Sequence, residues 1–461
     1  MTMLQFPPGF LWGTATSAFQ IEGAHDVDGR QPSIWDEFCQ TPGAIENGDD
    51  GRLGVDHYHR YREDVALVAG LGLNSYRFSV SWPRVLDGER INPAGMDFYS
   101  RLVDELLSAG IEPWLTLYHW DLPASLPGGW TNRDTAHRFA DYAAVLYDRL
   151  GDRVPTWTTL NEPWCSSFLS YAGGEHAPGH TDPVEAVRAM HHLLLGHGLA
   201  VQALRAAGAD RLGITLNFGP VLPASDDPAD LSVARRVDGT ANRVFVHPIF
   251  TGEYPADVRA DLGPWWQDDL VADGDLATIA EPIDVLGVNY YKTAVVRAGE
   301  PVEPWLVRGR KRYTPDIAAP DAVPVPRDLP RTAMDWEVEA DGLRRLLLWL
   351  HRDYAGPAGV PLVVTENGAA YPDDRVGPDG VVEDLDRIGY LRDHLAAVHA
   401  AITEGADVRG YLEWSLLDNF EWAWGYDKKF GIVAVDAAMN RTPKASAAWY
   451  GAVAQRGGVE R

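Results

Sequence analysis

Eight short apolar runs, rich in β-branched and aromatic residues, recur along the chain and limit the folds it can adopt. They occupy residues 10–16, 75–81, 112–119, 156–162, 211–218, 284–291, 361–367 and 410–417. Between them lie stretches with apolar residues at intervals of three and four, as in residues 98–110 and 137–151, a spacing typical of amphipathic helices. Eight strand-then-helix units without a change of composition predict an α/β fold, a single (β/α)8 TIM barrel over residues 1–461.

A doubly wound open sheet is the alternative α/β architecture. Such a sheet usually carries the glycine pattern G-x-G-x-x-G after its first strand, and the segment GTATSAFQIEG does not contain it. In the barrel we expect extended loops at the carboxyl ends of the strands. The longest of them, residues 296–330, is rich in proline, which predicts no regular structure and a wall of the substrate entrance.

Composition narrows the class of partner. With 46% hydrophobic residues the chain can build a large core, and its formal net charge is −26. A surface of that sign repels phosphate backbones and anionic lipid, so we expect neither a nucleic-acid nor a membrane partner. A small-molecule ligand is the expected partner, and the sequence leaves open whether the chain forms a homo-oligomer.

The N-terminal segment MTMLQFPPGF lacks the basic and apolar regions of a signal peptide, which predicts a cytoplasmic protein. Two cysteines, Cys39 and Cys165, cannot build a disulfide framework and do not have the spacing of a metal site. Cys165 lies close to Glu162 in sequence, yet we expect it to be a small buried apolar residue.

Two glutamates end strands of the predicted barrel. Glu162 follows the fourth run in TLNEP, and Glu366 follows the seventh in TENG. Because the carboxyl ends of barrel strands share one face, both acids should lie in the same mouth. Cleavage of a glycosidic bond uses such a pair, since one acid protonates the leaving oxygen while the other attacks the anomeric carbon or activates water. The spacing alone does not say which acid has which role.

Other strand ends carry the side chains that sugars need. Aromatic rings pack against the apolar face of a pyranose, and amide, imidazole and carboxylate groups bind its hydroxyls. Asn161, directly before Glu162, is a donor and acceptor suited to a sugar hydroxyl. The candidates are His119, Trp120, Asn161, Asn289, Tyr291, Trp414, Glu421, Trp422 and Phe430.

The motifs together resemble the family 1 glycoside hydrolases, the β-glucosidase family, over essentially the whole chain. They include FLWGTATSAFQIEG, YRFSVSWPR, LYHWDLP, TLNEPW, HAPG, GVNYY, VVTENG and WSLLDNFEWAWGY. The resemblance implies a retaining β-glycosidase with Glu162 as general acid/base and Glu366 as nucleophile. It implies removal of terminal β-D-glucosyl residues, with galactosyl and fucosyl also accepted, from β-glucosides and short oligosaccharides such as cellobiose. No cofactor or metal is expected.

The resemblance also assigns roles to binding residues. It implies Gln20, His119, Asn161, Glu421 and Trp422 as hydrogen-bonding groups of the glycone subsite and Trp414 as its stacking floor. Trp120, Asn289, Tyr291 and Phe430 would line the same pocket. Arg77 and Tyr291 would support the nucleophile, and Trp336 would lie on the aglycone side.

Several positions depart from the usual family pattern. Asp335 replaces a glycine, Glu413 replaces an apolar residue and Trp424 adds an aromatic ring, which leaves the aglycone preference open. A 6-phospho-β-glycosidase is an alternative within the family, and Lys428 matches its phosphate-binding lysine. Glu421 and Phe430 stand where that branch has Ser and Tyr, so we expect an unphosphorylated sugar.

Two other classes of protein compete. A metal-dependent hydrolase is suggested by the H-x-H pattern at residues 57–59, but that triplet opens a helical stretch. His191, His192 and His197 lie on an apolar helical segment, where packing is expected. A non-catalytic sugar-binding relative is the other rival. The sequence does not distinguish glucose, galactose and fucose.

Overall fold

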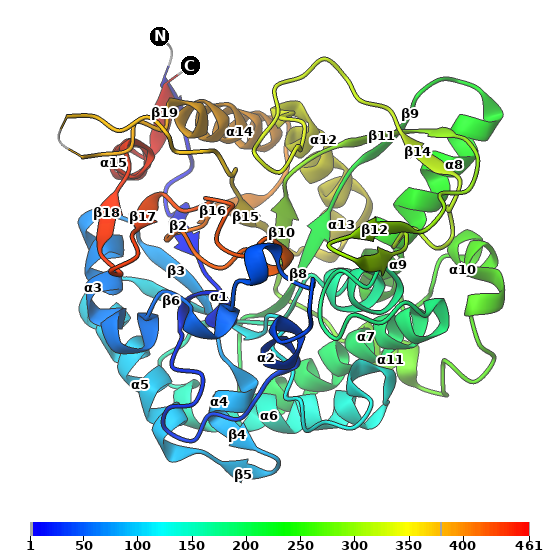
Figure 1. Cartoon of the computed structure of the whole chain (residues 1–461), viewed down its shortest axis with the longest axis horizontal. Coiled ribbons are helices and arrows are strands. Elements are labelled where there is room, and N and C mark those ends of the chain that lie inside the picture. The colour runs from blue at the N-terminus through cyan, green and yellow to red at the C-terminus, as the bar shows by residue number, and fades with distance from the viewer. Residues whose placement is uncertain (1–2, 379, 461) are drawn as a thin grey trace.

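The computed structural model describes residues 3–378 and 380–460, and its centre is a closed barrel of eight parallel strands (Figure 1). Around the barrel the strand order is β10-β15-β16-β2-β3-β6-β7-β8. The bounds are β2 Leu11–Ala15, β3 Ser75–Ser79, β6 Glu112–Tyr118, β7 Thr156–Asn161, β8 Leu212–Phe218, β10 Val285–Tyr290, β15 Leu362–Asn367 and β16 Val408–Trp414. Each predicted run contains or overlaps one of these strands, so the predicted barrel is confirmed.

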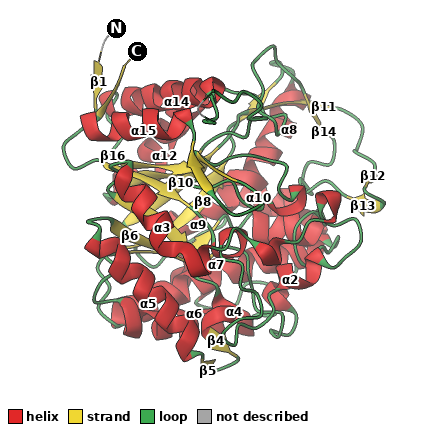
Figure 2. Cartoon of the chain, turned by 60° about the vertical axis from the view of Figure 1, so that its left-hand side comes forward, coloured by secondary structure: helices red, strands yellow, loops and turns green. Residues whose placement is uncertain are grey.

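Helices surround the strands (Figure 2). They are α1 Ala18–Ile21, α2 Ile34–Cys39, α3 His57–Gly70, α4 Trp82–Val85, α5 Pro93–Ser108, α6 Asp134–Leu150, α7 Pro183–Ala206, α8 Pro228–Asp238, α9 Val244–Thr251, α10 Ala256–Leu262, α11 Asp275–Ile279, α12 Ala340–Leu350, α13 Gly356–Ala358, α14 Leu385–Thr403 and α15 Ala445–Arg456. In α6, Phe139, Ala143, Leu146 and Leu150 form one buried stripe, as their spacing predicts.

Helix α7 shows how the local sequence sets an element boundary. Asp182 precedes it and accepts hydrogen bonds from the backbone N–H groups of Val184 and Glu185 at 2.8 and 3.4 Å. Pro183 occupies the first helical position, where its missing N–H costs no hydrogen bond. Capping by an aspartate typically stabilises a helix by about 1 kcal/mol.

The barrel strands are buried on both faces. Inside the barrel, Trp114, Val285, Val363 and Leu412 form a cluster. The outward side chains join a larger core against the helices. A parallel sheet covered on both faces needs continuous apolar runs, which explains the composition of sequences such as LVVTEN in β15. The filled interior gives the site above it a rigid base.

The prediction that residues 296–330 lack regular structure is wrong. β11 (Ala294–Ala298) pairs with β14 (Ala322–Pro324) and with β9 (Val221–Pro223). β12 (Trp305–Val307) and β13 (Arg310–Arg312) form an antiparallel hairpin. Proline is tolerated in β14 because this strand lies at the edge of its sheet, where one side needs no donor.

Short strand pairs complete the fold. β1 (Met3–Gln5) pairs with β19 (Gly458–Glu460), so the two ends of the described chain lie side by side (Figure 1). The other pairs are β4 Leu86–Asp87 with β5 Arg90–Ile91 and β17 Val433–Val435 with β18 Arg441–Pro443. A helix that crosses a bilayer needs about 20 apolar residues, and none of the helices within residues 3–378 and 380–460 meets that requirement.

Candidate active site

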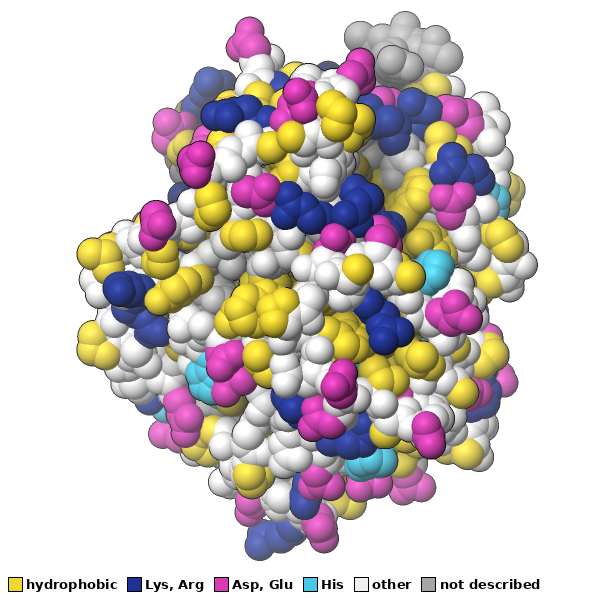
Figure 3. Space-filling view, turned by 90° about the vertical axis from the view of Figure 1, so that its right-hand side faces the viewer, with side chains coloured by type: hydrophobic (Ala, Val, Ile, Leu, Met, Phe, Trp, Pro, Cys, Tyr) yellow, Lys and Arg dark blue, Asp and Glu magenta, His cyan; other side chains and the backbone are white. Residues whose placement is uncertain are grey.

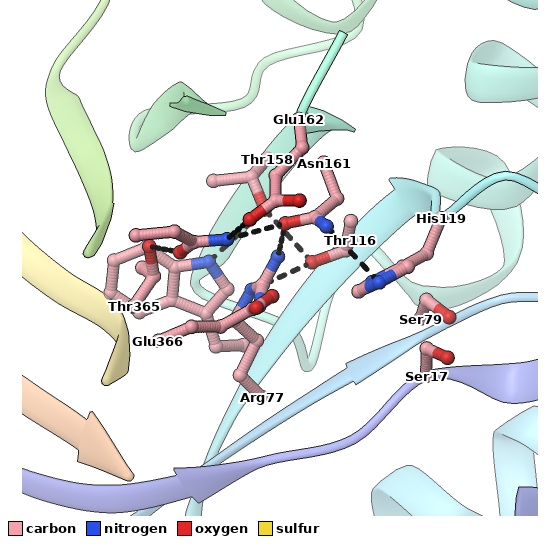
Figure 4. Close-up of polar contacts among 12 residues, drawn as sticks. Ser17, Arg77, Ser79, Thr116, His119, Thr158, Asn161, Glu162, Thr365 and Glu366 are labelled. Carbon is pink, nitrogen blue, oxygen red and sulfur yellow. Dashed lines mark hydrogen bonds and ion pairs between the residues drawn. The ribbon is translucent and has the colours of Figure 1, made fainter. Parts of the chain in front are cut away.

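Polar side chains from four barrel strands converge at the carboxyl ends of these strands (Figure 4). Arg77 comes from β3, Asn161 ends β7, and Glu366 lies near the end of β15. Asn289 of β10 pairs in register with Glu366. Glu162 follows β7 directly, and its backbone N–H donates to the carbonyl of Thr215 at 3.0 Å. The two predicted acids therefore share one mouth, although they are far apart in sequence.

Glu366 is held by two donors. Arg77 Nη1 donates to its Oε1 at 2.6 Å, and the Tyr291 hydroxyl donates to its Oε2 at 2.9 Å. Burial raises the pKa of Glu366, while the charge of Arg77 and the bond from Tyr291 oppose that rise. Both partners stabilise the carboxylate form, which matches the support that the resemblance implied for this residue.

Glu162 has a different environment. It is 6% exposed, and it accepts hydrogen bonds from Asn289 Nδ2 at 2.8 Å and from the Cys165 thiol at 3.2 Å. Burial and, second, the charge of Glu366 raise the pKa of Glu162 to about 8. At neutral pH the Glu162 carboxyl is therefore protonated. The neighbouring Glu366 is stabilised as a carboxylate by Arg77 and Tyr291. Two carboxyls with such unequal environments suit acid and nucleophile roles.

Asn161 connects the two acids to the rest of the site. Its Oδ1 accepts from Arg77 Nη2 at 2.7 Å and from Asn289 Nδ2 at 3.1 Å. Its Nδ2 lies 3.0 Å from His119 Nε2. Because the amide nitrogen donates, Nε2 of His119 accepts and Nδ1 carries the proton. Burial lowers the pKa of His119 well below its usual value, so the ring is neutral.

Aromatic rings enclose the pocket. The His119 ring is stacked with Trp414 and with Trp422, at centroid distances of 5.7 and 5.9 Å. Trp120 lies 4.4 Å from Trp422. On the other side, Trp414 and Phe430 belong to a cluster that also includes Tyr291 and Trp336. The structure thus brings the predicted aromatic residues together at one site.

Gln20 and Glu421 meet at the far side of the pocket. The Gln20 amide donates to Asn419 Oδ1 at 3.0 Å and to the Phe420 carbonyl at 2.7 Å, so it is fixed to the loop that carries Glu421. Within the described residues Glu421 Oε2 is buried without a hydrogen-bond partner, as is His119 Nδ1. These two atoms are free to bind hydroxyl groups of a ligand.

Backbone strain is concentrated at the same place. Trp120, Glu162 and Trp422 have φ of 80°, 49° and 48°, in the left-handed region that non-glycine residues avoid. Residues held in such conformations cluster at functional sites, where the surrounding structure maintains them. Asp335 also has a positive φ, 58°, which explains the usual glycine at this position.

Sequence reasoning missed a layer of threonines below the acids. Arg77 Nε donates to Thr116 Oγ1 at 3.1 Å, and Thr116 and Thr158 hydroxyls are 3.1 Å apart (Figure 4). The period-two alternation of β6 and β7 was the signal available for them. The expectation for Cys165 was also incomplete: it is buried, but its thiol contacts the carboxyl of Glu162.

Some predicted positions lie outside the pocket. Glu413 is on the outer face of β16, where it accepts a hydrogen bond from Thr14 Oγ1 at 3.2 Å, so its departure from the family pattern does not bear on the aglycone. His57 begins α3, as predicted, and lies 2.8 Å from Asp64. His191 of α7 is buried, as predicted, and its ring nitrogens lie 2.9 Å from the Tyr254 hydroxyl and 3.0 Å from Asp275 Oδ2.

Comparisons with known proteins agree with this geometry. Residues 2–459 match the sequence profile of glycosyl hydrolase family 1. The thermostable beta-glucosidase B of Thermobispora bispora is 50% identical over 99% of this chain and 92% of that protein. A bifunctional beta-D-glucosidase/beta-D-fucosidase of Bifidobacterium breve is 48% identical, with 98% of each chain covered. The crystal structure of a psychrophilic beta-glucosidase from Micrococcus antarcticus superposes with a TM-score of 0.95 at 49% identity, covering 99% of this chain and 100% of that one.

Proposed function

Because the chain belongs to glycosyl hydrolase family 1, we propose that it is a retaining β-glucosidase. It removes terminal β-D-glucosyl residues from β-glucosides and from short β-linked oligosaccharides such as cellobiose. The observation that carries this proposal is the unequal pair of buried acids. Glu366 is held by Arg77 at 2.6 Å, and burial raises the pKa of Glu162 to about 8.

The first step forms a covalent intermediate. Glu162 gives its proton to the glycosidic oxygen, and a carboxylate oxygen of Glu366 attacks the anomeric carbon. The bond between that carbon and the leaving oxygen breaks, and the aglycone departs as an alcohol. Glu366 then carries the sugar as an ester, and Arg77 loses the charge that it faced.

The second step uses the same residues in the opposite direction. Once Glu366 is an ester, the negative charge beside Glu162 is gone, so the pKa of Glu162 falls from its raised value. Glu162 then takes a proton from water as the water oxygen attacks the anomeric carbon. The carbon–ester bond breaks, and the sugar leaves with its original configuration.

The pocket favours an unphosphorylated sugar. The carboxyl of Glu421, whose Oε2 is buried, stands where a phosphate-binding branch would have a serine, so a phosphate would meet a further acid in place of a hydroxyl donor. Lys428 is already engaged, since its Nζ donates to the Ala333 carbonyl at 2.9 Å and lies 4.8 Å from the Trp424 ring. The named activity of the Bifidobacterium breve relative supports β-fucosides as further substrates.

A cytoplasmic location and a role in using cellulose-derived sugars belong to the same proposal. Cys39 and Cys165 are both free. Unpaired cysteines suit the reducing cytoplasm, where cellobiose taken up by a cell would meet the enzyme.

Replacement of the nucleophile tests the mechanism. Glu366→Gly is expected to abolish turnover of aryl β-glucosides, because no carboxylate remains to form the ester. Added azide should restore turnover and yield an α-glucosyl azide, identified by NMR, because azide attacks from the side that Glu366 occupied. A wild-type protein inert on aryl β-glucosides, or a rescued product of β configuration, would contradict the proposal.

A further inference from the structure

The β12–β13 hairpin is attached to the segment that carries the acid. Tyr313, just after β13, donates its backbone N–H to the Gly173 carbonyl at 3.3 Å, and Arg312 Nη1 donates to the Gly174 carbonyl. Gly173 follows the π-helical segment η4 (Cys165–Ala172), which begins shortly after Glu162. Figure 2 shows the hairpin at the periphery of the fold. Its inner end therefore lies in the wall of the catalytic mouth.

Two arginines of this hairpin have buried donors without partners. Arg312 is 2% exposed, and its Nη2 has no hydrogen-bond partner among residues 3–378 and 380–460. Nη1 of Arg310, on the same strand, is also buried and has no hydrogen-bond partner in that part of the chain. Burial and the charge of Arg310 lower the pKa of Arg312 to about 10. A buried N–H donor without a partner is costly, and natural structures normally pair it.

A third arginine on the hairpin shows what full pairing looks like. Arg308 donates to the carboxylate of Glu46 and to the carbonyl groups of Gly43 and Ala44. Elsewhere, Lys and Arg side chains are interspersed with Asp and Glu over the face in Figure 3. In a chain of net charge −26, carboxylates are plentiful. The free donors of Arg310 and Arg312 therefore do not result from a shortage of acids.

Charged residues link these donors to Lys292, which lies near the aglycone side of the pocket. Glu175 lies within electrostatic range of Arg312, Arg308 and Lys292, which oppose the rise that burial causes in the pKa of Glu175. Lys292 Nζ is 5.5 Å from the ring of Trp336, the residue expected on the aglycone side.

His176 and Asp316 complete the set of titratable neighbours. Burial and the charge of Arg312 lower the pKa of His176 to about 3, so the ring is neutral. That ring lies 5.0 Å from Trp120 of the pocket. Burial raises the pKa of Asp316 to about 6, and the opposing charge comes from Lys292. The acids near Lys292 also include Asp335 and Glu337, and neither accepts a hydrogen bond from Arg310 or Arg312 in the described chain.

We infer that Arg310 and Arg312 form an oxyanion subsite in the aglycone-side wall, which binds a carboxylate or phosphate group through their free N–H groups. Guanidinium groups present a planar fork that matches the oxygens of such anions. Arg310 is oriented for this by the ring of Phe38, which lies 5.0 Å from its Cζ. Two sources share this chemistry: an acidic substituent on the aglycone and a free inorganic anion.

Matched substrates test the aglycone source. Hydrolysis of 4-carboxyphenyl β-glucoside is compared with hydrolysis of its neutral isostere, 4-carbamoylphenyl β-glucoside. We expect the wild type to show a KM about tenfold lower for the carboxylate, the effect of one charge-assisted hydrogen bond. Arg310→Gln and Arg312→Gln should each remove most of this preference, measured as the ratio of kcat/KM for the two substrates.

Two further variants keep the test specific. Lys311→Gln removes the same charge from an exposed position on the same strand, so it should preserve the preference. Glu175→Gln removes a carboxylate that competes for Arg312, so it should increase the preference. Equal loss in Lys311→Gln, or no loss in either arginine variant, would overturn the aglycone assignment. Arg310 is only partly buried, so its variant remains informative if Arg312→Gln fails to fold.

Calorimetry with inorganic phosphate, at ionic strength held constant with chloride, tests the free-anion source. Phosphate binding that both arginine variants abolish, without any carboxylate preference in catalysis, would assign the subsite to free anions. Absence of both effects in the wild type would overturn the inference. The kinetic arm rests on the proposed β-glucosidase activity and the calorimetric arm does not, so failure of the activity and failure of the subsite are distinguishable.

Discussion

Buried arginines have different surroundings in two parts of the pocket. We call the strand ends around Arg77, Glu162 and Glu366 the floor, and the β12–β13 hairpin with Arg310 and Arg312 the wall. On the floor, Arg77 donates from Nε, Nη1 and Nη2 to Thr116, Glu366 and Asn161. In the wall, Arg310 and Arg312 keep donors without partners in the described chain. A fully bonded arginine is preorganised for a reaction that does not depend on the aglycone. The donors of Arg310 and Arg312 that lack partners can instead form hydrogen bonds with an acidic group of the aglycone.

Neutralising Glu162, the acid of the floor, is expected to have the largest effect. Glu162→Gln should lower kcat/KM about 10²- to 10⁴-fold for glucosides with alkyl leaving groups, because these leave only when protonated. The loss should be equal for acidic and neutral aglycones. Dinitrophenyl β-glucoside, whose leaving group needs no proton, is the control for nucleophilic attack and should keep its pre-steady-state burst. A loss that depends on aglycone charge would mean that Glu162 and the wall arginines Arg310 and Arg312 do not contribute independently to kcat/KM.

Removal of the floor arginine gives the next largest effect. Arg77→Met leaves Glu366 without its closest cation, so the pKa of Glu366 rises further. The reaction needs the ionised form, which exists above that pKa, so the acidic limb of kcat/KM should move to higher pH. We expect about a hundredfold loss at pH 6, consistent with the cost of breaking a buried ion pair.

Arg84→Met is the matched control for Arg77→Met. Arg84 is also buried and paired, at 2.7 Å from Glu22, but it makes no contact with the two acids in the described chain. This variant should lose thermal stability without a shift of the acidic limb. An unchanged limb in Arg77→Met would show that Tyr291 alone maintains the carboxylate.

The same contrast explains what the sequence could predict. Floor residues end strands whose apolar runs are visible in the sequence, and the barrel dictates that strand ends meet. Glu162 and Glu366 could therefore be paired from the sequence alone. The eight strands followed from the same periodicity, although β16 spans Val408–Trp414 and the predicted run was 410–417.

The wall could not be predicted in this way. Pro301, Pro304 and Pro315 near the hairpin suggested irregular structure, yet they flank β12 and β13 and do not interrupt them. The cations of the wall meet Gly174 and Glu175 through long-range contacts that no local pattern encodes. Cys165 was hard to assign for the same reason, since its spacing from Glu162 did not reveal that its thiol points at the carboxyl.

Cys165 lies between the two regions and gives the smallest predicted effect. Its thiol donates to Glu162 Oε2 at 3.2 Å, and it also lies within electrostatic range of Glu175. Glu162 acts as acid only below its pKa, so activity should fall as the pH rises through about 8. The thiol bond lowers that pKa, so its removal in Cys165→Ala should move the alkaline limb upward by less than about one pH unit.

Cys165→Ser retains a donor at this position and should keep the limb near that of the wild type. The pKa of Glu421 is also raised to about 8, so the alkaline limb of the pH–activity profile reflects both Glu162 and Glu421. The difference between the Ala and Ser variants isolates the contribution of Glu162. If Cys165→Ala instead changes the preference between carboxylate and carboxamide aglycones, Cys165 belongs to the wall. A residue that is hydrogen-bonded to the acid Glu162 would then also determine the aglycone preference.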